Sequence, residues 1–519
     1  MGERLNEIPE EVMEDIKDFE QSEVSKNQVS ESIKYFKNEH NMRQMLKSEA
    51  LKVKKMIQTE KQAQNGILPE LKPRAVADIF EQHFYCIKLS NQEGERVLFY
   101  DCFVGIYVRN YDQIKRYIAM IEPNLNEKQA ESVIYHIGND TKIKPETKSR
   151  TLIPVGNGIY DLKQHKLLPF SHKYVFLTKV KTNYVDKPLV PNINGWTVDD
   201  WFLELAKGDQ QIVNLFWEVI SDSINGNFSR RTAIFLVSTQ GSTGKGSFQS
   251  LIINLVGMEN VATLKVNEFD SRFALENIDG KTVVIGDDIA PDIYIKDSSN
   301  FNSVVSGDPI QIEPKGKKAY PAILTPAVIQ SSNGMPNFHN KEGTNRRLLI
   351  IPFNNHFEGD GNNWDIKDDY LKRDEVLQYV LYKALQLDFT KFSVPDASSR
   401  ALDDFKLEND PVRAFKVEYF DKWDLTKVPV SYVYEVYVIY CEARGQKRMS
   451  QAKFTRQFLE LIKNKYEKKK TRYNDAEASA VKAVIEEAVK ELDRLNKIYS
   501  HDFSLETEKT FNSYVPCSS

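Results

Sequence analysis

The sequence has 519 residues, of which 41% are hydrophobic and 28% charged, as in an ordinary globular protein of about three domains. Its 70 basic and 74 acidic side chains leave a net charge of −4, so the total charge identifies no partner and must be examined segment by segment. Four cysteines without a CxxC pair and eight histidines without an HExxH motif disfavour a disulfide framework and a zinc site. No apolar run approaches a membrane span, so we expect no membrane association and a location in the reducing cytoplasm.

Composition and periodicity predict five segments in chain order. We expect a helical N-terminal arm at 1–64, an α+β domain at 65–195, an α/β core at 196–360, a helical lid or linker at 361–400 and a C-terminal domain at 401–519. Mixed charge and helical spacing of apolar residues in the arm fit a solvated helix pair packed on its own domain, and a partner-binding role stays open.

The core is predicted from four apolar runs that alternate with helical stretches. These runs lie at 232–238, 282–286, 324–331 and 348–353. Buried strands separated by helices are typical of a parallel sheet with crossover helices, so the predicted fold class is α/β.

The first of these strands runs into a glycine-rich turn and then an amphipathic helix. Such a turn can wrap backbone N–H groups around a polyphosphate, while Lys245 adds a charge. The match to GxxxxGK[ST] has two departures: Thr239 stands at the first glycine position and Gly246 at the hydroxyl position that binds Mg²⁺. Ser247 is the nearest substitute, and an ordinary strand-to-helix turn is the alternative. The predicted nucleotide-binding residues are Gly241, Ser242, Thr243, Gly244, Lys245, Gly246 and Ser247.

Polar residues follow or precede the other predicted strands. Asp287 is suited to hold Mg²⁺ and Asp288 to orient an attacking water, unless the pair is a solvated strand end. Asn333 could bind water or the γ-phosphate, although Asn-Gly is also a common turn. Arg346 and Arg347 precede the last strand and could stabilise transferred phosphoryl charge across a subunit boundary, or form intrachain ion pairs.

The order and spacing of these motifs resemble the superfamily 3 helicases of viruses, phages and plasmids. Within them the sequence is similar to the phage and poxvirus primase-helicase family, which includes helicase-initiator Rep proteins of staphylococcal pathogenicity islands. The resemblance extends upstream, where 157–162 and 168–172 look like the family's N-terminal helicase-associated domain, and includes Arg272-Phe273 and 305–310.

This resemblance implies an AAA+ P-loop ATPase that assembles as a homo-hexamer and moves along one DNA strand using ATP. It implies that Lys245 and Asp287 bind Mg-ATP and that Asp288 is the catalytic carboxylate. It further implies that Asn333 is a polar sensor and that one of the two arginines is a trans-acting finger.

A basic hairpin is predicted between the acidic pair and Asn333. Alternating apolar residues at 308–320 flank a Pro-Lys-Gly-Lys turn with Lys315, Lys317 and Lys318 at or near its tip. In superfamily 3 relatives a hairpin at this position lines the central channel and grips DNA. Lysines also keep exposed turns soluble, which is the alternative.

The C-terminal domain carries the strongest local charge. Eleven Lys/Arg against two Glu give +9 over 444–472. Helices at 430–441 and 449–466 followed by a basic wing or turn would fit a winged-helix-like domain that binds duplex DNA, whereas a solvated basic helix is the alternative. The predicted DNA-binding residues here are Lys468, Lys469, Lys470 and Arg472.

These features favour an ATP- and Mg²⁺-dependent hexameric DNA helicase and replication initiator of a phage, plasmid or pathogenicity island. Its expected partners are single- and double-stranded DNA including an origin, further copies of the chain, and host or phage replication proteins. An origin-binding ATPase or loader without unwinding activity, or the helicase half of a primase system, stays open. A primase is disfavoured because the chain has no Asp-x-Asp pair for a two-metal centre and residues 1–70 are too short for a separate catalytic domain.

Overall fold

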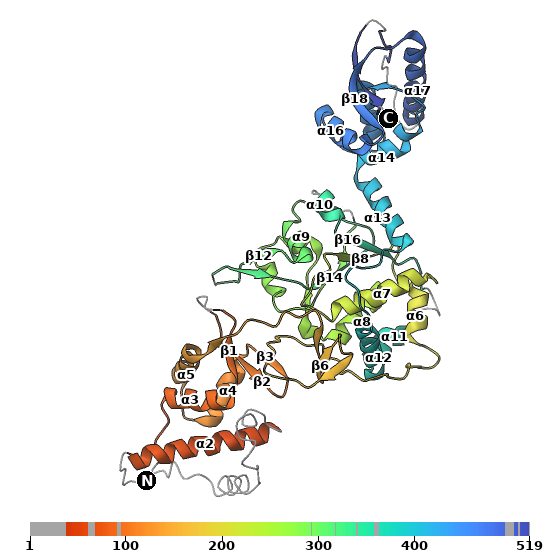
Figure 1. The fold of residues 1–519 in the computed structure, drawn as a ribbon. Helices are drawn as coiled ribbons and strands as arrows, with labels where there is room; N and C mark the ends of the chain where they lie inside the picture. The colour runs from red at the N-terminus through yellow and green to blue at the C-terminus, as the bar shows by residue number, and fades with distance from the viewer. Residues whose placement is uncertain are drawn as a thin grey trace.

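The computed structural model describes residues 38–60, 68–90, 95–291, 293–316, 318–338, 341–357, 363–493, 503–506 and 509–517. The N-terminal helices, the central sheet and the C-terminal domain follow one another along an elongated molecule (Figure 1). Within the described residues, no helix combines the length and the apolar character needed to cross a bilayer.

The N-terminal domain is α+β. Its helices are α2 (Glu39–Glu60), α3 (Pro73–His83), α4 (Tyr111–Ile121) and α5 (Glu127–Asp140). Its four-stranded sheet, in the order β3-β2-β1-β4, consists of β1 (Cys86–Lys88), β2 (Leu98–Asp101), β3 (Ile106–Val108) and β4 (Lys142–Ile143). Met42 and Leu46 of α2 are fully buried in this domain, which fits the predicted packed arm from residue 39 onwards. The arm's first 37 residues lie outside the described part.

A second sheet connects the N-terminal domain with the core. It is antiparallel and consists of β5 (Leu152–Val155), β6 (Gly158–Asp161) and β7 (Lys166–Leu168). Ile153, Val155 and Tyr160 share one hydrophobic cluster with the helices of the ATPase core. The hydrophobic cluster of the α/β core therefore includes residues that precede the predicted boundary at residue 195.

The central sheet has five parallel strands in the order β16-β8-β14-β10-β9. They are β8 (Ala233–Val237), β9 (Val261–Thr263), β10 (Val283–Ile289), β14 (Ala327–Ser332) and β16 (Leu348–Pro352). The four predicted runs form β8, β10, β14 and β16, although the run at 324–331 begins as a strand only at Ala327, after three residues that connect it to the hairpin. Since all five strands are parallel, their carboxyl ends meet at one edge.

Helices flank the sheet and connect it to the C-terminal domain (Figure 1). They are α6 (Val198–Leu205), α7 (Gln210–Ser223), α8 (Lys245–Val256), α9 (Ser299–Ser306), α10 (Lys341–Asn345), α11 (Trp364–Asp368), α12 (Asp374–Leu385) and α13 (Asp396–Asn409). Short strands β11 (Tyr294–Ile295) and β15 (Asn337–Phe338) pair in parallel, and β12 (Pro309–Ile312) and β13 (Tyr320–Ile323) form the predicted antiparallel hairpin. The 3-10 helices are η2 (Met258–Asn260), η3 (Val266–Glu268), η4 (Ala274–Asn277), η6 (Tyr370–Lys372) and η7 (Phe420–Lys422).

The C-terminal domain combines helices with a three-stranded sheet in the order β17-β19-β18. Its elements are α14 (Pro411–Glu418), β17 (Val428–Pro429), α15 (Val430–Ala443), α16 (Gln451–Ile462), β18 (Tyr466–Thr471), α17 (Asp475–Asp493) and β19 (Phe511–Pro516). The second predicted helix ends at Ile462 because Tyr466 already belongs to a strand, so the basic segment that was predicted as a wing or turn is an edge strand. The α/β core, the α+β N-terminal domain and the winged-helix-like order of C-terminal elements confirm the predicted fold class.

Candidate ATP site and DNA-binding surfaces

The glycine-rich turn between β8 and α8 is shaped for close backbone approach. Ser242 and Gly244 adopt left-handed φ values of +52° and +88°. The φ of Gly244 favours glycine, and a Cβ atom there would also displace the end of the Leu205 side chain. At Gly246, by contrast, a Cβ atom would have no neighbour closer than the Lys367 Nζ at 3.8 Å. Gly246, which replaces the hydroxyl residue of the phosphate-loop motif, therefore stands where the structure leaves room for a side chain.

Lys245 is the first residue of α8 and lies in a polar network at the carboxyl edge of the sheet. Its ammonium donates to the Ser238 hydroxyl, to the Asn333 Oδ1 at 3.0 Å and to the Thr243 hydroxyl at 3.3 Å. Burial lowers the pKa of Lys245, and the nearby carboxylates of Asp287 and Asp288 oppose this shift. The structure thus brings the predicted loop lysine and the predicted sensor amide into direct contact.

The acidic pair lies near the carboxyl end of β10, at an irregularity in the pairing of this strand with β14. The register shifts between Gly286 and Ile289, and Asp288 has a left-handed φ of +50°, which is strained for a residue other than glycine. Asp287 Oδ1 accepts from the Ser331 hydroxyl at 2.6 Å and from the Asp288 backbone N–H at 3.0 Å. Both carboxylate side chains are exposed on the same edge as the loop. The bulge therefore turns two successive carboxylates toward the nucleotide side.

The arginines Arg346 and Arg347 lie at the opposite edge, because they precede β16 and the strands are parallel. Arg347 donates to the Ser306 hydroxyl at 2.7 Å and to the Gly343 carbonyl, and burial together with the Arg346 charge lowers its pKa. Arg346 is exposed and has no hydrogen-bond or ion-pair partner within the described residues. The structure therefore does not bring either arginine to the phosphate loop of the same chain.

The residues present fit a magnesium ion that is held mainly by phosphates. In the described part of the chain no three His, Cys, Asp or Glu side chains are grouped to hold a metal by themselves. A nucleotide-bound Mg²⁺ needs only one or two protein oxygens beside waters and phosphates. Asp287 offers such an oxygen, and Ser247 is half-buried in the first turn of α8 with no hydrogen bond to another described residue.

Three side chains of this site were not predicted from the sequence. Ser238 and Ser331 connect the lysine, the amide and the acidic pair, and Lys265 donates to the Asp288 carbonyl at 3.0 Å. Polar residues at the carboxyl ends of two apolar strands were the available signal for the serines. No sequence pattern indicated Lys265, because this residue follows β9, a short strand at the edge of the sheet.

The hairpin formed by β12 and β13 holds its lysines on the amino-terminal side of the sheet. The Tyr320 hydroxyl donates to Asp279 Oδ2 at 2.8 Å, and the Lys315 backbone N–H donates to Glu276 Oε2 at 3.2 Å. Both acceptors precede β10. The side chains of Lys315 and Lys318 are exposed, and the predicted Lys317 lies outside the described residues.

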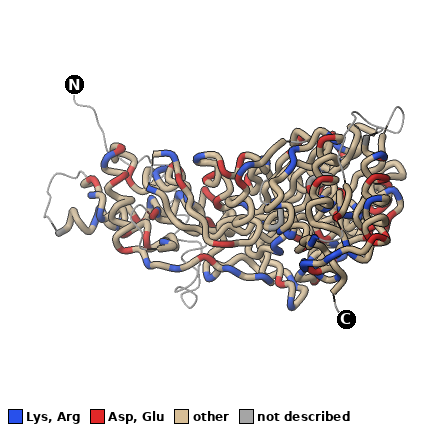
Figure 2. Tube along the Cα trace, turned by 90° about the horizontal axis from the view of Figure 1, so that it is seen from above, with Lys and Arg blue, Asp and Glu red and all other residues tan. Residues whose placement is uncertain are grey.

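The basic C-terminal stretch is partly neutralised by ion pairs. Lys469 pairs with Glu467, and Lys463 pairs with Glu460 at 2.7 Å. Lys468 and Lys470 are exposed on the edge strand β18 without an ion pair to a described residue, and the Arg472 guanidinium lies 3.5 Å from the Thr510 hydroxyl. Figure 2 shows basic segments gathered near the C-terminus. Because side chains alternate along a strand, Lys468 and Lys470 lie on one face of β18 and Lys469 on the other.

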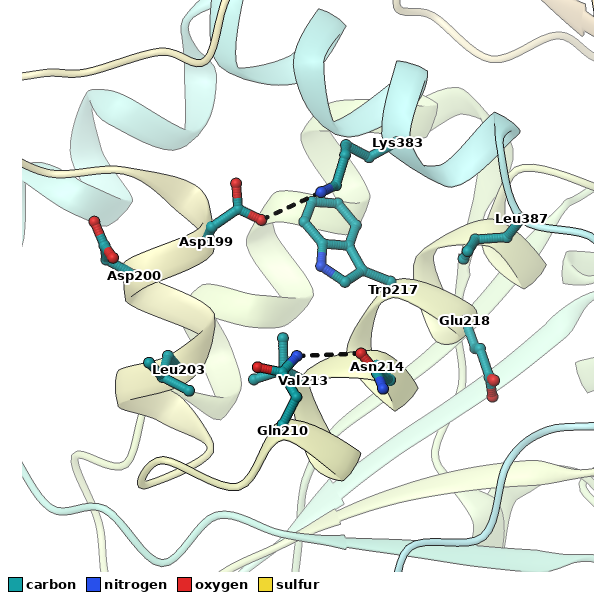
Figure 3. Close-up of a pocket in the computed structure, with 10 residues that line it drawn as sticks. All are labelled: Asp199, Asp200, Leu203, Gln210, Val213, Asn214, Trp217, Glu218, Lys383 and Leu387. Atoms are coloured by element: carbon teal, nitrogen blue, oxygen red, sulfur yellow. Dashed lines mark hydrogen bonds and ion pairs between the residues drawn. The ribbon is translucent and has the colours of Figure 1, made fainter.

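A groove of about 590 Å³ between α6, α7 and α12 contains none of the predicted site residues (Figure 3). Asp199 accepts from Tyr379 and pairs with Lys383 at 3.6 Å, while Glu218 accepts from Ser393. The residues that line the groove are Asp199, Asp200, Leu203, Gln210, Val213, Asn214, Trp217, Glu218, Lys383 and Leu387. These polar contacts connect the helices around the groove.

The parallel sheet, the phosphate loop and the acidic pair define a P-loop ATPase. The chain is also similar to three family models: D5 N terminal like at residues 1–202, a family of unknown function (DUF5906) at 236–347 and Poxvirus D5 protein-like at 407–491. The two D5 models match the N-terminal and the C-terminal parts of the chain, so the chain resembles the D5-like primase-helicase family of superfamily 3. Members of the D5-like family are superfamily 3 ATPases and helicases, and this resemblance agrees with a nucleotide-binding site at the phosphate loop.

Solved structures of the NrS-1 C terminal region also match the chain. Three of them, all of the apo form, are 11%, 12% and 13% identical to it, each with a TM-score of 0.46. Each match covers 78% of this chain and 97% of the other.

We predict that Ser247→Ala raises the Mg²⁺ concentration for half-maximal ATP hydrolysis by roughly tenfold if this hydroxyl replaces the one missing at Gly246. The measurement is a magnesium titration of ATPase activity at saturating ATP. Ser250→Ala is the matched control, because that hydroxyl donates to the Gly246 carbonyl at 2.8 Å within the same helix. Equal titrations for the two variants would remove Ser247 from the metal site.

Proposed function

We propose that the chain assembles as a homo-hexameric ring that hydrolyses Mg-ATP at its subunit interfaces, moves along single-stranded DNA and opens a replication origin of a phage, plasmid or pathogenicity island. The observation that carries this proposal is the placement of Arg346 at the sheet edge opposite Lys245. Along five residues of strand these edges are separated by roughly 15 Å, so Arg346 cannot reach its own phosphate loop. A neighbouring copy can supply it.

At this interface each side chain has a distinct task. The loop N–H groups and Lys245 hold the phosphates, Asp287 and the Ser247 hydroxyl orient the metal ligands, and Asp288 accepts a proton from the attacking water. Mg²⁺, when bound with the nucleotide, would neutralise charge on the β- and γ-phosphates. Asn333 contacts Lys245 at 3.0 Å, so a γ-phosphate that engages the lysine also changes the environment of the amide. The amide can thus report which nucleotide is bound.

DNA contacts are assigned to two surfaces. The exposed lysines of the β12–β13 hairpin offer positive charge for the phosphate backbone of the translocating strand. The hairpin leads directly into β14, the strand that ends in Asn333, so nucleotide state and hairpin position share one element. The exposed side chains of Lys468 and Lys470 on β18 are assigned to duplex DNA at the origin.

The trans arrangement predicts complementation between two inactive variants. Lys245→Ala loses the phosphate lysine and Arg346→Ala loses the finger, an effect on the order of 10³ in kcat. When the two variants are co-assembled, rings contain interfaces with both groups intact, and we expect ATPase activity to recover to up to about a quarter of wild type. Arg347→Lys serves as the control at the neighbouring position. Full activity of Arg346→Ala alone, or of Lys245→Ala alone, contradicts the assignment.

The hairpin predicts that hydrolysis and unwinding can be separated. We expect Lys315→Ala to retain ATPase activity within about twofold, because the lysine is remote from the phosphates, and to lose most unwinding of a tailed duplex. Lys318→Ala is measured in parallel. Unchanged unwinding by a variant that carries both Lys315→Ala and Lys318→Ala would favour an origin-binding ATPase or loader instead of a translocating helicase.

The alternation along β18 predicts a difference between adjacent lysines. Replacing both Lys468 and Lys470 by alanine should weaken duplex binding and reduce the log–log salt slope by up to about one per lost phosphate contact. Lys469→Ala is the control, because that side chain points to the other face and pairs with Glu467. Fluorescence anisotropy over a salt series measures the affinity for duplex DNA and the dependence of this affinity on salt. Equal slopes for all variants would make this strand ordinary solvated surface.

A further inference from the structure

The short helix α11 lies over the phosphate loop, although it belongs to the segment predicted only as a lid or linker. The Nζ of Lys367 is 3.8 Å from the position that a Cβ atom at Gly246 would take. Apart from the chain neighbours of Gly246 and the backbone of α8, no other atom of the described residues lies within 4 Å of that position. The glycine that replaces the expected hydroxyl residue therefore leaves space that the Lys367 ammonium faces.

Hydrogen bonds hold the chain on both sides of α11 against the loop and its helix. Before α11, the His356 ring nitrogen Nδ1 lies 2.7 Å from the Gly241 carbonyl, and the Phe357 N–H donates to the Ser242 carbonyl at 2.9 Å. After α11, the Leu371 carbonyl accepts from Asn254 of α8 at 2.9 Å. The position of Lys367 is thus set by three contacts with the nucleotide-binding element.

Trp364 lies one helical turn before Lys367, on the same face of α11. Residues three apart on a helix are neighbours. The indole is 67% exposed, which is unusual for the largest aromatic side chain. Lys367 is exposed as well and forms no ion pair with a described residue. A cation beside the phosphate loop and an uncovered aromatic plane one turn away match the two ends of a nucleoside triphosphate.

We propose that α11 clamps the nucleotide in cis: Lys367 binds the phosphates over Gly246, and Trp364 stacks on the base. The inference deepens the proposed ATP site and rests on it. Charge-assisted contacts with phosphate oxygens stabilise the bound nucleotide, and stacking on an aromatic side chain accepts any base because every base has a flat π surface.

The test compares nucleotide binding and hydrolysis in matched variants of the full chain. We expect Lys367→Ala to raise the KM for ATP roughly tenfold with kcat changed less than about threefold, and Lys367→Arg to restore most of the affinity. Lys372→Ala is the control, because it removes an exposed lysine five residues further on in the same segment. Trp364→Ala should weaken ATP binding roughly fivefold but leave binding of inorganic tripolyphosphate unchanged, and Trp364→Phe should recover ATP affinity.

Different failures have different meanings. If Lys367→Ala equals Lys372→Ala while Lys245→Ala abolishes hydrolysis, the clamp is wrong and the ATP site stands. If Trp364→Ala weakens tripolyphosphate as much as ATP, the indole does not stack on the base and that half of the proposal is overturned. If Lys245→Ala itself retains wild-type hydrolysis, the proposed ATP site falls and the clamp falls with it.

Discussion

β14 lies between β8 and β10 in parallel register, and this position brings three loops from distant parts of the chain to one edge of the sheet. Several hydrogen bonds join these loops, among them those from Lys245 to Asn333 at 3.0 Å and from Ser331 to Asp287 at 2.6 Å. Both connect a neighbouring strand with the carboxyl end of β14. Any displacement of β14 along its axis would therefore alter the lysine and the acidic pair together, which makes this strand the element through which nucleotide state can act on the rest of the core.

The same parallel order separates two sets of residues that the proposed reaction needs together. Asp287 and Asp288 lie at the carboxyl edge, while Arg346 and the base of the hairpin lie at the amino edge of the same sheet. In the proposed ring, one copy would place the amino-terminal end of its sheet against the carboxyl end of its neighbour's sheet and so complete a site that a single chain leaves incomplete. In such a ring the hairpin of one subunit is connected through β14 to its own Asn333, so hydrolysis at an interface can be transmitted to DNA contacts without a separate signalling element.

The sequence predicts more of the strands than of their contacts. Apolar runs identify four of the five strands because these strands are buried on both faces, whereas β9 has only three residues and leaves no comparable pattern. The lateral order of strands has no local signature, so the contacts between Ser238, Lys245 and Asn333 could not be predicted even though their elements were. The two arginines are equivalent in the sequence. Only the tertiary contact with Ser306 distinguishes Arg347, which is held within its own chain, from the exposed Arg346. The residue roles themselves stay predictions.

The structure also changes the interpretation of the local charge that was counted from the sequence. The +9 stretch at 444–472 treats all its cations alike, yet Arg444, Lys463 and Lys469 each pair with a glutamate. An exposed ion pair contributes little to stability, but it reduces the positive potential that a phosphate would meet. Because residues alternate along β18, the unpaired Lys468 and Lys470 concentrate on one face while the paired Lys469 points away. The positive potential of this stretch is therefore smaller than the sequence count implies, because part of its charge is neutralised within the chain.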